Sequence, residues 1–293
     1  MVNEFLQYLR YEKNYSSHTV LSYHTDLDQF SAFLNIPNKL SDPSSITPQQ
    51  IQQWVLSLMS QEISARTLSR KISTLKSFWH FLLVRHYTST NPTLKIILPK
   101  TKKPLPTFFK QSEMNTALNS LFIPDNFESI RNQLILAIFY LTGIRRSELL
   151  NIKDIDIDLS GASIRVTGKR NKQRIIPIDN LLCKDIERYI AIRNETIDRF
   201  EPYFFVRNNG QKLYPKMLYN IVHDNMSKIS SLQKRSPHVL RHTFATSLLN
   251  GGADINAVKE LLGHSSLAAT QVYTHTSFEE LYNIYKQAHP RAK

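Results

Sequence analysis

The hydrophobic positions of residues 1–92 follow the spacing of amphipathic helices. Apolar residues three or four positions apart predict a first helix that begins at Val2 and includes Leu9. A second stripe of apolar residues follows Ser16 and Ser17, and either serine can cap the start of a helix. The chain therefore opens with two predicted helices.

Two more helices are predicted in the same region. Thr47 can cap a helix, Pro48 fits its first turn, and Gln50 completes a capping box. A fourth stripe of apolar residues runs from about Ser64 to His86. Together the four stripes predict a small helical bundle.

The next stretch separates this bundle from a second domain. It is rich in proline and lysine, a composition typical of an extended, semi-stiff linker. The predicted organisation is a helical domain over residues 1–92, a basic linker over residues 93–107 and a second domain over residues 108–293.

The second domain combines helical spacing with short alternating segments. Alternation of apolar and polar residues in 155–158 and 163–167 predicts strands, and 174–178 is the return strand of a hairpin. Helices are predicted at 111–122, 127–142, 146–152, 180–197, 215–229, 237–250, 255–262 and 267–273, and a capping box at Ser277 predicts the start of a last helix. The expected fold class is mostly α with a small β-sheet, an α+β domain after an all-helical one.

Composition adds a strongly basic balance to this picture. The chain has 37 Lys and Arg against 24 Asp and Glu, a formal net charge of +13. This excess favours a polyanionic partner, nucleic acid before membrane. A single cysteine, Cys183, excludes an intrachain disulfide and fits a reducing cytoplasm. No apolar run is long enough to span a bilayer and no leader precedes the first helix, so we expect a cytoplasmic protein.

Six polar residues form a set suited to attacking a phosphodiester. Arginine binds phosphate oxygens with two parallel N–H groups, tyrosine can form a covalent phosphotyrosine, and lysine or histidine can move protons. The set is found in Thr142-Gly143-Ile144-Arg145, Lys169 at the hairpin turn, His238-Val239-Leu240-Arg241, Leu262-Gly263-His264 and Tyr273.

In order and spacing this set resembles the tyrosine recombinase (phage integrase) family, over nearly the whole chain. The matching positions are Arg145, Lys169, His238, Arg241, His264 and Tyr273. The resemblance is closest to the bacterial Xer recombinases, and the ending Ala288-His289-Pro290-Arg291 favours the XerC type over XerD. It implies that residues 1–92 are a SAM-like core-binding domain and that residues 108–293 are catalytic.

The resemblance also implies a role for each residue. Arg145 and Arg241 would neutralise charge on the phosphate, and His264 would donate a hydrogen bond to it. Tyr273 would be the nucleophile, with His238 accepting its proton. Lys169 would protonate the departing 5′ oxygen, with Lys172 as the weaker candidate, and Arg170 replaces a glycine that is usual in this turn. The product would be a 3′-phosphotyrosyl link and a free 5′ hydroxyl.

Further basic residues are candidates for contact with DNA phosphates. For those on the fourth helix, a merely solvated basic face is the alternative. The candidates are Arg66, Arg70, Lys71 and Lys76 on that helix, Lys100, Lys102 and Lys103 in the linker, and Lys172 at the hairpin.

No cofactor and no metal site are expected. His238 and His264 are far apart in the sequence, and His242, His275 and His289 complete no metal-ligand pattern with them. The chain also has no glycine-rich phosphate loop. The resemblance implies duplex DNA at a specific recombination site as substrate. It also implies a XerD-like partner in a heterotetramer or further copies of this chain in a homotetramer, association with FtsK, and resolution of chromosome dimers at cell division.

Three other functions stay open. An integrase of a phage or mobile element has the same chemistry, although such proteins often carry an arm-binding domain for which a helix beginning near Met1 leaves no room. A type IB topoisomerase has nearly the same catalytic set but changes only linking number. A catalytically silent DNA-binding regulator is disfavoured by the intact set.

The last predicted helix has one apolar face, formed by Phe278, Leu281, Tyr282 and Tyr285. Insertion of this face into a groove on a neighbouring subunit would suit a cyclic tetramer. The alternative is that the helix packs on its own domain.

Overall fold

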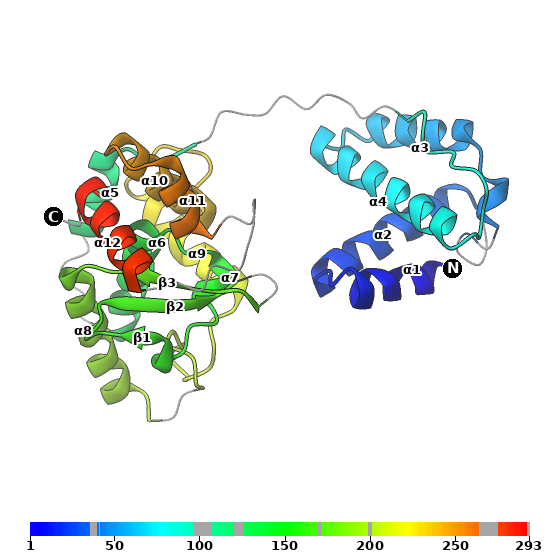
Figure 1. Cartoon of the computed structure of the whole chain (residues 1–293). Helices are drawn as coiled ribbons and strands as arrows, with labels where there is room; N and C mark the ends of the chain where they lie inside the picture. The colour runs from blue at the N-terminus through cyan, green and yellow to red at the C-terminus, as the bar shows by residue number, and fades with distance from the viewer. Residues whose placement is uncertain are drawn as a thin grey trace. The chain divides into compact units, whose positions relative to one another are not determined.

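A computed structural model of the chain describes residues 1–35, 40, 42–96, 107–119, 126–168, 171–198, 201–263 and 275–291, except the side chains of residues 119 and 275–280. The chain divides into two compact units, Met1–Pro104 and Leu105–Lys293 (Figure 1). In the described part, no helix is long and apolar enough to cross a membrane.

All secondary-structure elements described in the first unit are helical. Its elements are α1 (Val2–Gln7), a π-helical turn (Tyr8–Glu12), α2 (Ser17–Phe33), a 3₁₀ turn (Pro43–Ser45), α3 (Pro48–Ser60) and α4 (Ala65–Val84). The predicted starts are confirmed: Ser16 caps α2, Thr47 and Gln50 form the capping box of α3, and Ser64 caps α4. The core combines aliphatic and aromatic side chains, and the Phe30 ring packs against those of Trp54 and Trp79.

This core extends into the predicted linker. Thr93 and Ile96 are buried in the first unit, so the start of the 93–107 linker is wrong by at least four residues. The extended form of its remainder stays a prediction, because residues 97–106 lie outside the described part.

The second unit surrounds one long buried helix, α6 (Phe127–Thr142), with helices and a small sheet. The strands β1 (Ile157–Asp158), β2 (Ser163–Thr167) and β3 (Gln173–Pro177) form an antiparallel sheet in the order β1-β2-β3. The other helices are α5 (Gln111–Asn119), α7 (Arg146–Leu149), α8 (Asn180–Thr196), α9 (Pro215–Ser227), α10 (Pro237–Asn250), α11 (Ile255–Leu262) and α12 (His275–Ala288), with a 3₁₀ turn at Asp154–Asp156. The predicted fold class is confirmed.

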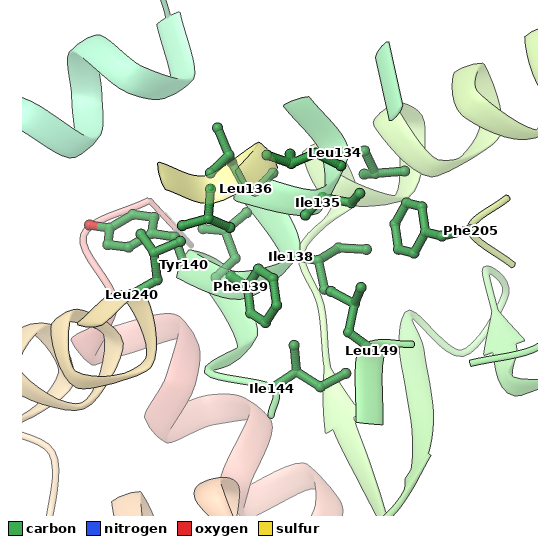
Figure 2. Packing of buried hydrophobic residues seen from close by; sticks show 14 of the residues in the cluster. Leu134, Ile135, Leu136, Ile138, Phe139, Tyr140, Ile144, Leu149, Phe205 and Leu240 are labelled. Atoms are coloured by element: carbon green, nitrogen blue, oxygen red, sulfur yellow. The ribbon is translucent and has the colours of Figure 1, made fainter. Parts of the chain in front are cut away.

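Helix α6 organises this unit because nearly all of its side chains are buried. Figure 2 shows its residues Leu134, Ile135, Leu136, Ile138, Phe139 and Tyr140 packed with Ile144, Leu149, Phe205 and Leu240 from other segments. Helices α5, α8, α9 and α10 all contact α6. Burial of every residue from Leu134 to Thr142 explains why this part of the helix is almost continuously apolar.

Three predicted elements differ from the structure. The helix predicted at 146–152 ends at Leu149. The first strand is shorter than predicted, because Asp154–Asp156 form a 3₁₀ turn and the strand begins at Ile157. The last helix begins at His275, so Ser277 lies inside it and is not its cap. The predicted helix at 267–273 lies outside the described residues.

Helix α12 packs on its own domain, which corrects the expectation of a face free for a neighbouring subunit. Leu281, Tyr285 and Ala288 are buried against a cluster from α10 and α11 that includes Phe244 and Leu261. A Cβ on Gly251, at the end of α10, would lie 2.0 Å from the carbonyl oxygen of Ala288. Close approach of the two backbones therefore requires glycine there.

Candidate active site

Three arginines from three different segments converge on the end of α11, and two of them bind the single buried carboxylate of Glu148. Arg145 precedes α7 and donates from Nη1 to Glu148 Oε1 at 2.6 Å. Its backbone N–H donates to Glu148 Oε2 at 2.9 Å, which ties the start of α7 to the same carboxylate. Arg174, on β3, donates to both Glu148 oxygens at 2.8 and 2.9 Å.

The charge of Glu148 depends on these arginines. Burial by itself would raise the pKa of this carboxyl, but the hydrogen bonds and charge of Arg174, followed by those of Arg145, lower it from 4.5 to about 2. Glu148 is therefore a fixed anion at neutral pH, and it holds Arg145 with its side chain still about one third exposed (35%).

Arg241 is the third cation of the cluster. It lies on α10, is buried, and donates to the carbonyl oxygens of Gly143 and Leu262, both at 2.5 Å. Burial, and next the charges of Arg145 and Arg174, lower its pKa to about 9. The guanidinium remains cationic at neutral pH, although its surroundings disfavour the charge.

The turn before Arg145 requires glycine. Gly143 ends α6 with φ of +58°, in the left-handed region. A Cβ there would lie 2.3 Å from the ring of Phe244. Both restrictions explain the Thr-Gly-x-Arg sequence, because the tight turn brings the Gly143 carbonyl to Arg241 and directs the chain into α7.

The arginines also hold the end of α11 by three successive carbonyl oxygens. Arg174 donates to Leu261 at 3.0 Å, Arg241 to Leu262 at 2.5 Å and Arg145 to Gly263 at 2.6 Å. These carbonyls have no helical partners at a C-terminus, and cations are favoured there. The chain that continues to His264 therefore leaves α11 from a point fixed by the cluster.

The β2–β3 hairpin reaches the same cluster. Gly168 donates its N–H to the Lys172 carbonyl at 2.8 Å, which closes the base of the turn. A Cβ on Gly168 would lie 3.1 Å from Glu148 Oε1 and 3.9 Å from Arg145 Nη1. The turn that carries Lys169 thus starts beside Arg145, although Lys169 itself, like His264 and Tyr273, lies outside the described residues. Lys172 is exposed.

His238 lies in the first turn of α10, one helical turn before Arg241, and is exposed. Its ring packs edge-on against that of His242, with 4.7 Å between ring centres. The structure thus brings together Arg145, Arg241 and the base of the hairpin, and places His238 on the helix that carries Arg241.

Two residues of this cluster, Glu148 and Arg174, were not among the site residues predicted from the sequence. Each of them nevertheless has a recognisable sequence feature. Glu148 stands three residues after Arg145, the residue that precedes its helix, which is the position of the glutamate in a capping box. Arg174 occupies a buried position in the alternation of β3, where an arginine needs a partner.

The candidate DNA contacts on α4 divide by exposure. Arg66 is exposed and Lys76 is half-buried. Lys71 is buried, and its ammonium binds Asp26 at 3.0 Å and also Gln29. The assignment of Lys71 as a phosphate contact is corrected, because its ammonium is buried and paired with the Asp26 carboxylate.

Arg70 is intermediate, because it is paired with a buried carboxylate and is also exposed. Its guanidinium binds Asp26 and Ser22, and the side chain stays 43% exposed. The linker candidates Lys100, Lys102 and Lys103 lie outside the described residues. Within the described residues, no three His, Cys, Asp or Glu side chains gather as a metal site would need.

Comparison with known proteins identifies the family. The model of the phage integrase family matches residues 107–280, and that of the phage integrase N-terminal SAM-like domain matches residues 2–86. Tyrosine recombinase XerC of Staphylococcus carnosus (strain TM300) is 40% identical over 290 residues, covering 99% of this chain and 97% of the relative. Tyrosine recombinase XerC of Bacillus pumilus (strain SAFR-032) is 37% identical over 300 residues, covering 100% and 97%.

The fold matches as well. A crystal structure of the XerH site-specific recombinase bound to difH substrate, a pre-cleavage complex, aligns with a TM-score of 0.69 and 22% identity, over 98% of this chain and 84% of that one. The domain matches, the full-length relatives and the convergence of Arg145 and Arg241 agree. The chain therefore belongs to the phage integrase family of tyrosine recombinases.

Proposed function

We propose that this chain is a site-specific recombinase of the XerC type that cleaves and rejoins duplex DNA through Tyr273. The observation that carries the proposal is the arginine cluster. Arg145, Arg174 and Arg241 supply three positive charges against the one negative charge of Glu148, so the cluster has a net charge of +2. A partly exposed site with this surplus favours a phosphate.

Arg145 and Arg241 are the proposed phosphate ligands. Attack on a phosphodiester places negative charge on its non-bridging oxygens, and guanidinium groups already held in position stabilise that charge without reorganising. Loss of one such donor costs about 10²–10³ in rate in comparable sites. Arg145 already has an exposed portion of side chain to offer, whereas Arg241 would exchange carbonyl contacts for phosphate oxygens.

The proposed reaction conserves bond energy. The Tyr273 oxygen forms a bond to phosphorus while the bond to the 5′ oxygen breaks. His238 accepts the tyrosine proton and Lys169 gives a proton to the 5′ oxygen, while His264 donates a hydrogen bond to the phosphate. Attack of a 5′ hydroxyl on the 3′-phosphotyrosine reverses these steps, so religation needs no ATP.

Duplex DNA at a recombination site is the proposed substrate, supported by the fold shared with the XerH–difH complex and by the net charge of +13. The finer assignment follows the XerC relatives. We infer a cytoplasmic enzyme that acts with a XerD-like partner in a heterotetramer, or with its own copies, in association with FtsK to resolve chromosome dimers. Recombination between two sites on one plasmid separates this function from that of a topoisomerase, which would change only linking number.

Replacement of the nucleophile tests the proposal. Tyr273→Phe is expected to bind site DNA as the unmodified chain does but to form no covalent adduct on a nicked suicide substrate in excess EDTA. Tyr282→Phe is the matched control, because it removes another tyrosine hydroxyl from the same C-terminal region and should leave the adduct intact.

Denaturing gels report the outcome. An adduct that persists in Tyr273→Phe would falsify the assignment. An adduct of the unmodified chain that is lost in EDTA and restored by magnesium would contradict the metal-independent mechanism.

A further inference from the structure

Arg174 occupies a junction in the catalytic unit that the reaction as described does not use. Its side chain is about 5% exposed, so it is not placed to contact DNA directly. Through its guanidinium it joins three segments: β3, on which it lies, the Glu148 carboxylate of α7, and the Leu261 carbonyl at the end of α11.

Each of these segments leads to a proposed catalytic group. Glu148 binds both the guanidinium and the backbone N–H of Arg145. β3 is the return strand of the hairpin whose turn carries Lys169. The end of α11 continues directly into His264, and the hypothetical Cβ of Gly263 would lie 3.1–3.3 Å from the Arg174 side chain, so the arginine packs beneath that exit.

The geometry of the contact depends on arginine. A planar fork satisfies both carboxylate oxygens while its Nε–H remains for a third acceptor, the Leu261 carbonyl. Lysine keeps the charge but cannot make these three directed bonds from one plane. A lysine at this position would therefore leave Glu148 or the end of α11 less firmly held.

We propose that Arg174 is a positioning residue for DNA cleavage. It fixes the Glu148 carboxylate, which orients Arg145, and it binds the end of α11 to the β2–β3 hairpin. This proposal rests on the proposed function. It assigns no contact with DNA to Arg174, so its loss should slow the chemical step and leave DNA affinity unchanged.

The chain offers a matched control in Arg193. This arginine of α8 is equally buried, binds both Asp154 oxygens at 2.8 Å and donates to the Phe204 carbonyl at 3.0 Å. It thus has the same kind of contacts as Arg174, and within the described part of the chain none of its hydrogen bonds is to a residue of the arginine cluster. Both Arg174→Lys and Arg193→Lys should lower stability, Arg174→Lys by more because Glu148 is buried whereas Asp154 is 46% exposed. Only Arg174→Lys should lose cleavage rate.

The experiment measures covalent adduct formation at saturating nicked substrate, together with DNA affinity and melting temperature. Arg174→Lys is expected to lower the adduct rate by up to about 100-fold, the effect of a misplacement of about 1 Å, with affinity unchanged. Because Arg174 acts through Arg145, adding Arg174→Lys to Arg145→Ala should slow the reaction by much less than it does in the unmodified chain.

The outcomes separate the two proposals. The positioning role would be overturned if the effects of Arg174→Lys and Arg145→Ala on the adduct rate were fully additive. Equal adduct rates for Arg174→Lys and Arg193→Lys would overturn it as well. If Arg174→Lys unfolds, Arg174→Gln and Arg193→Gln are compared instead. If both Arg174 variants unfold while the Arg193 variants stay folded, the role of Arg174 is to stabilise the fold and the positioning role is overturned. Absence of any Tyr273 adduct in the unmodified chain would instead overturn the proposed function.

Discussion

At the scale of single residues, charge alone did not distinguish surface cations from buried ones. Arg66, Arg70, Lys71 and Lys76 all lie on α4, yet Lys71 is buried on Asp26 while Arg66 is exposed. Burying a carboxylate is costly unless it is paired. Asp26, which is fully buried, therefore determines which α4 cation has a structural role.

This difference predicts opposite effects for two substitutions on α4. Lys71→Met should lower the free energy of unfolding by about 1–3 kcal/mol, since Asp26 loses one of its partners, and should leave the salt dependence of DNA binding unchanged. Arg66→Ala should have little effect on stability and should reduce the slope of log affinity against log salt by about 0.9, the value for one phosphate contact.

Denaturant unfolding and binding titrations over a salt series measure both quantities. A changed salt slope for Lys71→Met would show that its ammonium reaches DNA after all. An unchanged slope for Arg66→Ala would remove Arg66 from the DNA contacts.

At the scale of elements, α12 is held to its domain by an aromatic group that contains a buried histidine. His289 follows α12 and packs among Tyr140, Phe244 and Tyr285, with ring centres 5.1–5.6 Å apart. Among the residues that the structure describes, its Nε2 has no hydrogen-bond partner. Burial lowers the pKa of His289 from 6.5 to about 4. A hydrogen bond with the Tyr140 backbone partly offsets this lowering, and the charge of Arg291 adds to it.

The packing of α12 should therefore weaken in mild acid. Between pH 6.5 and pH 4 the unfolded chain binds a proton at His289 that the folded chain excludes, so stability is lost as the pH falls through this interval. The loss approaches about 3 kcal/mol by pH 4, from a pKa difference of about 2.5. His289→Phe removes the titrating group and should flatten this part of the pH dependence.

Chemical unfolding at a series of pH values compares the two proteins. The informative quantity is their difference, because other groups, such as Glu148 with its pKa of about 2, titrate in both. Parallel curves between pH 6.5 and pH 4 would show that His289 is hydrated in solution.

At the scale of the whole molecule, the net charge of +13 belongs to a DNA-binding enzyme of two units joined by a lysine-rich segment. Part of that charge is engaged internally, because Lys71, Arg131, Arg174 and Arg193 are buried. The number of phosphate contacts is accordingly smaller than the number of basic residues.

Binding to duplex DNA should still be mostly electrostatic. The slope of log affinity against log salt is expected to be about −0.9 for each phosphate contacted, so that six contacts would cost about 10³ in affinity between 50 and 200 mM salt. Fluorescence anisotropy on site DNA and on an unrelated duplex of equal length gives the two slopes. A flat response on site DNA would contradict extensive contact with the phosphate backbone.

The sequence by itself determined the local structure and the chemistry. Helix starts at Ser16, Thr47 and Ser64 follow from capping, which involves only neighbouring residues. The long helix from Phe127 to Thr142 was predicted with its observed bounds. The family could be inferred because its motif residues keep their order and spacing along the chain.

Only the tertiary structure decided which residues support that chemistry and where the last helix packs. Glu148 and Arg174 lie far along the chain from the carbonyls of Leu261 to Gly263, with 115 positions between Glu148 and Gly263, and nothing local links them. The apolar face of α12 would fit its own domain or a neighbour equally well by pattern, and in the structure Leu281 and Tyr285 are buried on α10 and α11. Burial and pairing depend on what the rest of the chain places opposite a residue, and periodicity carries no information about that.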